Sequence, residues 1–121
     1  MSSELSAPTN VTVVGLGYIG LPLALAFAKE LPTTGFDVDV SRVEQLMEGK
    51  DRNSEIPETE IISSDMLLSS ESSCLANADF IVVTVPTPVK EDHSPDLGPL
   101  ESASTSIGEQ LRERSADLPA P

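Results

Sequence analysis

Three glycines that directly follow a short apolar segment constrain this chain more than any other feature. Residues Val11–Val14 are all β-branched, which is typical of a buried strand. The segment Gly15-Leu16-Gly17-Tyr18-Ile19-Gly20 comes next, and residues 21–29 then predict a helix. A strand, a Gly-x-Gly-x-x-Gly turn and a helix in this order form a seat for a diphosphate, because backbone N–H groups at the helix start face the anion.

Each glycine has its own predicted role. Gly15 permits the tight turn out of the strand, and Gly17 lets the backbone approach a diphosphate where a Cβ would collide. Gly20 brings the helix close to the sheet, and we expect Ile19, Leu23, Ala26 and Phe27 to share one apolar face of the helix. The alternative is a glycine-rich turn that binds nothing. The strand before the turn and the helix after it favour the binding role.

An acidic residue supports the same interpretation. Residues 33–38 predict a second strand, and Asp37 near its end follows Gly20 by 17 residues. A carboxylate there can accept hydrogen bonds from both hydroxyls of the adenosine ribose. Its charge would repel a 2′-phosphate, which favours NAD over NADP. The alternative role, a helix cap, fits Asp39 or Ser41 better than Asp37.

The rest of the chain continues the alternation of strands and helices. We expect a helix over 40–48, a loop over 50–60 with a short helix after it, a weak strand over 66–70, one or two helical turns over 72–77, a strand over 79–85 and a helix over 99–112. The strand over 79–85 is nearly all apolar, as expected for a strand covered on both faces.

This alternation predicts an α/β fold, a Rossmann-type doubly wound parallel sheet that is truncated, with strand order 3-2-1-4. Ligands of such sheets bind at the carboxyl ends of the strands. The glycine turn and the segment from Pro86 to Pro88 should therefore face each other across one crevice.

Composition limits the partners. The 121 residues suit one domain, and 20 acidic against 7 basic side chains give a net charge of −13, which argues against nucleic acid or an anionic membrane as partner. No run of 18 apolar residues and no secretion signal occurs, so we expect a cytoplasmic protein. The acidic excess also suggests adaptation to high salt, a hypothesis that equal stability in dilute and molar salt would contradict.

The single cysteine and the single histidine suggest no chemistry. Cys74 has no histidine near it in sequence, and we expect a buried structural thiol. His93 stands in a polar loop between Asp92 and Ser94, with too few neighbouring ligands for a metal site.

The motifs together resemble the UDP-glucose/GDP-mannose dehydrogenase family over roughly residues 10–112. The matching segments are Val14-Gly15-Leu16-Gly17-Tyr18-Ile19-Gly20-Leu21-Pro22-Leu23-Ala24, Gly35-Phe36-Asp37, Arg42, Gly49-Lys50-Asp51, Val83-Thr84-Val85-Pro86-Thr87-Pro88, Asp96-Leu97 and Pro99-Leu100. The Val-Thr-Val-Pro-Thr-Pro and Pro-Asp-Leu segments are most similar to the branch that oxidises UDP-N-acetylhexosamines.

The resemblance implies a function and a set of site residues. Such enzymes oxidise the C6 alcohol of a nucleotide sugar to a uronic acid in two hydride transfers to NAD, for surface polysaccharide biosynthesis. The residues implied to bind the cofactor are Gly15, Gly17, Tyr18, Ile19, Gly20, Asp37, Arg42, Val85, Pro86 and Thr87. Two alternatives stay open: Arg42 as a solvated helix residue, and Pro86 with Thr87 as a strand terminator.

The family's catalytic cysteine lies in a later region, and Cys74 does not match its motif. We therefore expect residues 10–113 to form an incomplete NAD-binding domain that is inactive alone, between disordered segments 1–9 and 114–121. The fourth strand would have an open edge that invites association. The alternatives are a non-catalytic dinucleotide-binding or subunit-completing module and, less compatible with Pro-Thr-Pro, a hydroxyacid dehydrogenase. A UDP-sugar would be a partner only in a full-length enzyme.

Overall fold

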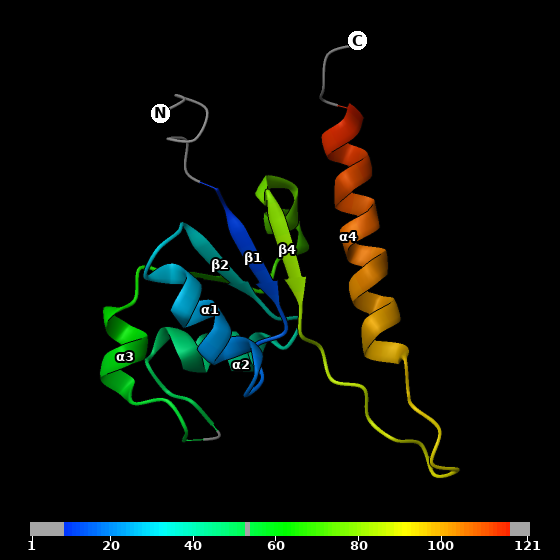
Figure 1. Ribbon diagram of the computed structural model, residues 1–121, viewed down its shortest axis with the longest axis horizontal. Helices are drawn as coiled ribbons and strands as arrows, with labels where there is room; N and C mark the ends of the chain where they lie inside the picture. The colour runs from blue at the N-terminus through cyan, green and yellow to red at the C-terminus, as the bar shows by residue number, and fades with distance from the viewer. Residues whose placement is uncertain (1–8, 53, 117–121) are drawn as a thin grey trace.

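The structure, a computed structural model, describes residues 9–52 and 54–116 (Figure 1). Four strands alternate with helical segments along the chain. In order these are β1 (Val11–Val14), α1 (Gly20–Ala28), β2 (Thr33–Phe36), α2 (Val40–Met47), α3 (Glu58–Ser63), β3 (Leu67–Ser69), the 3₁₀ helix η2 (Ser72–Asn77), β4 (Phe80–Val83) and α4 (Gly98–Ala116).

The four strands form one parallel sheet in the order β3-β2-β1-β4, which confirms the predicted fold and strand order. β1 lies at the centre, with Val14 level with Phe36 of β2 on one side and with Val83 of β4 on the other. This register aligns the carboxyl ends of the three strands at one edge of the sheet. The glycine turn leaves the sheet at that edge.

Each face of the sheet has its own core. Val11, Val13 and Leu16 pack on one face with Leu21, Ala24 and Leu25 of α1 and with residues of α2 and α3. On the other face, Val14, Phe36, Leu75 of η2 and Ala103 of α4 form a smaller cluster. Figure 1 shows α1 and α2 on one side of the strands and the long α4 standing beside β4. The helices therefore cover both faces, as a doubly wound sheet requires.

Two sequence expectations are wrong in their detail. The face predicted for α1 is not its most buried one: Ile19 precedes the helix and is 68% exposed, and Ala26 is exposed as well. The fully buried apolar side chains of α1 are Leu21, Ala24 and Leu25. The strand over 79–85 is shorter than expected and is not covered on both faces: Phe80 is 63% and Val83 38% exposed. Within the described residues β4 has β1 as its one neighbour, so the predicted open edge is confirmed.

The remaining bounds are close to those expected. Asp39 caps α2, its carboxylate accepting a hydrogen bond from the Arg42 N–H at 3.1 Å, so the capping role does fall on Asp39. The short helix α3 begins at Glu58, inside the predicted loop. α4 continues to Ala116, three residues past the expected domain boundary, while residues 1–8 and 117–121 of the expected terminal segments lie outside the described residues. In the described part of the chain no helix is long and apolar enough to cross a membrane.

Candidate dinucleotide-binding site

The turn after β1 needs glycine at two positions because neighbouring backbone lies too close for a side chain. Gly15 has a φ of +98°, and a Cβ there would lie 3.0 Å from the Thr84 carbonyl. A Cβ on Gly20 would collide with the carbonyl oxygen of Gly15 and with the Thr84 hydroxyl. That hydroxyl donates a 2.7 Å hydrogen bond to the Gly15 carbonyl, which ties the turn to the end of β4. The predicted backbone roles of Gly15 and Gly20 are confirmed.

Gly17 differs, because a Cβ there would meet nothing within 4 Å. No described residue accepts a hydrogen bond from the backbone N–H of Gly17, Tyr18 or Ile19, while the Leu21 N–H already bonds the Gly17 carbonyl at 2.9 Å. The turn thus presents backbone donors beside open space at the start of α1. Donors of this kind fit an anionic group, and the missing Cβ leaves room for it.

Asp37 stands next to this turn and is attached to it. Its Oδ2 accepts a hydrogen bond from the Leu16 N–H at 2.9 Å, and its Oδ1 accepts one from the Asp39 N–H at 2.9 Å. Each carboxylate oxygen can accept a further hydrogen bond, since an ionised carboxylate offers about four lone-pair sites. The half-buried side chain is therefore fixed in position and still able to accept from two hydroxyl groups.

Arg42 lies behind the turn rather than in solvent, so the interpretation of a solvated helix residue is wrong. Only 5% of its side chain is exposed. Its Nε and Nη2 donate to the Leu16 carbonyl at 2.9 and 2.7 Å, and its Nη1 forms a 3.0 Å ion pair with the buried Asp51. The guanidinium holds the turn in place, and the Asp51 carboxylate balances its charge.

A cavity of about 560 Å³ connects these groups at the carboxyl ends of β1 and β2. Its walls are the glycine turn, the end of β2, the segment after β4 and the first turns of α4. The lining residues are Val14, Gly15, Leu16, Gly17, Phe36, Asp37, Val38, Asp39, Arg42, Arg52, Val85, Pro86, Pro99, Ser102, Ala103 and Ser106. The cavity combines an apolar floor with a few polar groups, as is typical of cofactor sites.

The structure brings together six of the ten predicted residues, namely Gly15, Gly17, Asp37, Arg42, Val85 and Pro86. The predicted crevice between the glycine turn and the Pro86 segment is present. Tyr18, Ile19, Gly20 and Thr87 do not line the cavity. Tyr18 and Ile19 are exposed beside it and Gly20 is buried beneath it, so these residues can act only through their backbone or from the rim.

Sequence reasoning missed Arg52 and the wall contributed by α4. Arg52 comes from the loop after α2, and its Nε, Nη1 and Nη2 donate to Gln45, Asp39 and Ser41 at 3.0, 3.2 and 3.2 Å. Hydrogen bonds from Ser41, Arg42 and Arg52 hold the pKa of the Asp39 carboxyl below its usual value. The family match at Gly49-Lys50-Asp51 lies in this loop but stops one residue before Arg52.

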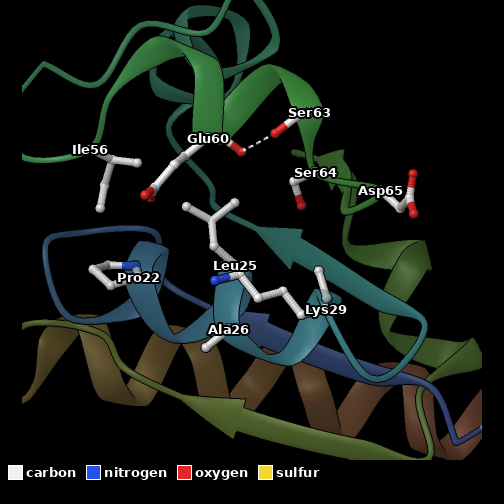
Figure 2. A pocket seen from close by; sticks show the side chains of 10 residues that line it. Pro22, Leu25, Ala26, Lys29, Ile56, Glu60, Ser63, Ser64 and Asp65 are labelled. Atoms are coloured by element: carbon white, nitrogen blue, oxygen red, sulfur yellow. Dashed lines mark hydrogen bonds between the residues drawn. The ribbon is translucent and has the colours of Figure 1, made fainter.

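Other parts of the molecule are weaker candidates. A cavity of about 330 Å³ lies between α1 and α3 and contains Lys29, Glu60 and Asp65, but none of the predicted residues (Figure 2). Cys74 lies in η2 outside the site and is only half-buried, so the expectation of a buried thiol is wrong in degree; the partial burial still raises the pKa of the thiol. Within residues 9–52 and 54–116, no group of three or more His, Cys, Asp or Glu side chains could hold a metal ion.

Comparisons with known proteins identify the family of this chain. Residues 9–116 match the NAD-binding domain of the UDP-glucose/GDP-mannose dehydrogenase family. UDP-N-acetyl-D-glucosamine 6-dehydrogenase of Pseudomonas aeruginosa is 41% identical over 105 residues, 86% of this chain and 25% of that protein. Protein CapL of Staphylococcus aureus is 40% identical over 102 residues, 84% and 24% of the two chains.

A solved structure of a nucleotide-sugar dehydrogenase also matches this chain. A UDP-glucose dehydrogenase from Pyrobaculum islandicum superposes with a TM-score of 0.78 at 27% identity, over 94% of this chain and 28% of that one. This chain thus spans about a quarter of the length of the relatives it matches. It belongs to the UDP-glucose/GDP-mannose dehydrogenase family, within that family's NAD-binding domain.

Proposed function

We propose that this chain supplies the NAD site of a nucleotide-sugar 6-dehydrogenase. The observation that carries the proposal is the turn at Gly17, where backbone donors without a described acceptor face open space. Asp37 is bonded to the same turn and keeps capacity for a ribose. A diphosphate and a neighbouring ribose need this pair of features.

Different residues bind different parts of the dinucleotide. Gly15, Gly17 and the backbone of Tyr18, Ile19 and Gly20 hold the diphosphate, and Asp37 accepts from the adenosine ribose. Arg42 acts from behind, through the Leu16 carbonyl. Val85, Pro86 and Thr87 lie toward the nicotinamide half, where they exclude water. Bound NAD would supply the acceptor for a hydride.

The substrate class comes from the relatives. Several are named for UDP-N-acetylhexosamines, including UDP-N-acetyl-D-mannosamine dehydrogenase of Escherichia coli at 34% identity. The proposed reaction is oxidation of a UDP-sugar C6 alcohol to a uronic acid within a longer protein. No thiol lines the cavity among the described residues, so we expect this chain alone to bind NAD without oxidising a UDP-sugar.

Calorimetric titration of the chain with NAD and NADP tests the proposal. We expect NAD to bind more tightly than NADP, because the Asp37 carboxylate repels a 2′-phosphate. Asp37→Asn should weaken the binding of NAD about tenfold to a hundredfold, as expected for a lost hydrogen bond to a charged group. The same substitution should reduce the preference for NAD over NADP. The control Asp65→Asn removes the same charge from an exposed site outside this cavity and should change neither. Absent NAD binding, or tighter NADP binding, would refute the proposal.

A second role is favoured by one observation, the open edge of β4 with Phe80 exposed. A parallel strand of another polypeptide could pair there and complete the sheet. In this role the chain is a subunit-completing module, and it can coexist with NAD binding because the edge and the turn are separate surfaces. The Phe80 variant described in the Discussion tests it.

A further inference from the structure

Arg52 is the feature of the cavity that neither the motifs nor the family resemblance explains. Two arginines line the cavity, and their surroundings differ. The Arg42 guanidinium is buried and engaged by the Leu16 carbonyl and Asp51. Arg52 keeps 43% of its side chain exposed, so among the described lining residues it is the cation with accessible surface.

The Arg52 guanidinium is also fixed in orientation. Its three nitrogens donate to three different acceptors, Gln45 Oε1, Asp39 Oδ2 and Ser41 Oγ, all on or at the start of α2. These bonds occupy the edge of the planar group. Hydrogen bonds to a guanidinium lie in its plane, so these three do not use its faces, and a guanidinium face is the surface that stacks on aromatic rings.

Its place follows from a chain of short contacts. The Leu16 N–H of the glycine turn bonds Asp37, the Asp39 N–H bonds the same carboxylate, and Asp39 then bonds Arg52. Along this chain of contacts the turn comes first, Asp37 second and Arg52 third. The diphosphate, the ribose and the base follow one another in the same order in the adenosine half of a dinucleotide. Arg52 therefore stands where the base would lie when the ribose is held by Asp37.

We propose that Arg52 is an adenine-binding residue whose guanidinium face stacks on the base of the bound dinucleotide. This inference rests on the proposed NAD site. A role as a receptor for a 2′-phosphate is disfavoured, because the Asp39 carboxylate lies 3.2 Å from the guanidinium and the Asp37 carboxylate accepts a hydrogen bond from the Asp39 N–H. These two carboxylates of the cavity lining would repel a further anion, whereas they do not oppose a neutral base.

The test compares Arg52→Ala with the matched control Lys50→Ala by calorimetry, using NAD, ADP-ribose and NADP as probes. Lys50 is two residues away, exposed, outside the cavity, and paired with Glu48 at 3.6 Å, so its removal changes the net charge equally. We expect Arg52→Ala to weaken NAD and ADP-ribose about tenfold each, since both contain adenine, and Lys50→Ala to stay within about twofold.

A second variant, Arg52→Gln, separates a loss of stacking on the base from a loss of local structure. The amide can still bond neighbouring polar groups but lacks the cationic plane, so it should bind NAD as weakly as Arg52→Ala while unfolding at the wild-type temperature. Unchanged NAD affinity in Arg52→Gln, equal losses in Arg52→Ala and Lys50→Ala, or a larger loss for NADP than for NAD would each overturn the inference. If Asp37→Asn weakens NAD and Arg52→Gln does not, only this inference fails; if the wild type binds no NAD, the proposed function fails with it.

Discussion

β1 and β4 are similar in sequence and opposite in environment. Val-Thr-Val-Val and Phe-Ile-Val-Val are both short apolar strands, and the two pair directly in the sheet. All four residues of β1 are buried, because β2 and β4 flank it and helices cover both of its faces. In β4, Phe80 and Val83 are exposed. Position in the sheet, rather than composition, decides how much of each strand is buried.

The difference separates two properties of the molecule. The glycine turn leaves the buried strand, and its geometry is fixed by contacts from β2, β4 and Arg42. The edge at β4 belongs to one of the two outer strands of the sheet, which has β1 as its one neighbour among the described residues, so surface is available there for a partner. We expect substitutions near β1 to affect stability and ligand binding, and those on β4 to affect association.

The largest effect should come from Arg42→Ala, which tests whether the interior behind the turn is as sensitive as its burial implies. The substitution removes the cation that neutralises the buried Asp51 carboxylate and both hydrogen bonds to the Leu16 carbonyl. We expect a loss of about 3–5 kcal/mol in the free energy of unfolding, measured by urea denaturation. Lys50→Ala, which breaks the exposed pair with Glu48, should change it by less than about 1 kcal/mol. Equal losses of unfolding free energy in Arg42→Ala and Lys50→Ala would contradict the view that the buried residues behind the turn are the more sensitive ones.

A smaller effect should come from a matched pair across the β1–β4 ladder. Val14 and Val83 lie in register, and 3% and 38% of their surfaces are exposed. We expect Val14→Ala to cost about 2 kcal/mol, from lost burial plus a residual cavity, and Val83→Ala less than about 1 kcal/mol. Both values come from the same denaturation measurement. A larger loss at Val83 would mean that this face of β4 is covered in solution.

The smallest effect on stability should come from Phe80→Lys at the open edge. With 63% of Phe80 exposed, the free energy of unfolding should stay within about 0.5 kcal/mol of the wild type. A lysine on an edge strand opposes pairing with another chain, so self-association measured by sedimentation should decrease. The control Ile62→Lys changes an exposed residue of α3, 60% accessible and away from the edge, and should leave association unchanged. Equal association of wild type and Phe80→Lys would exclude this edge as the contact.

Particular residues show how far the sequence could be interpreted. Gly15 and Gly20 were predictable because their roles depend on local backbone geometry at fixed spacing. Asp37 was predictable because the end of β2 must lie beside the end of β1 in a parallel sheet. The burial of Arg42 was not predictable, because its side chain can donate to the Leu16 carbonyl of the turn only once α2 has packed against the turn. Arg52 was missed since its acceptors come from three separate residues of α2 and its cap.

The sequence by itself determined the order of strands and helices, the strand order of the sheet, the glycine turn and its family, because periodicity, β-branched runs and glycine spacing act over a few residues. Only the tertiary structure decided that β1 is fully buried while β4 is only partly covered, that Arg42 supports the turn from behind, and that Arg52 and α4 close the cavity. These properties depend on which surfaces meet after the chain has folded, and contacts between distant segments leave no local pattern in the sequence.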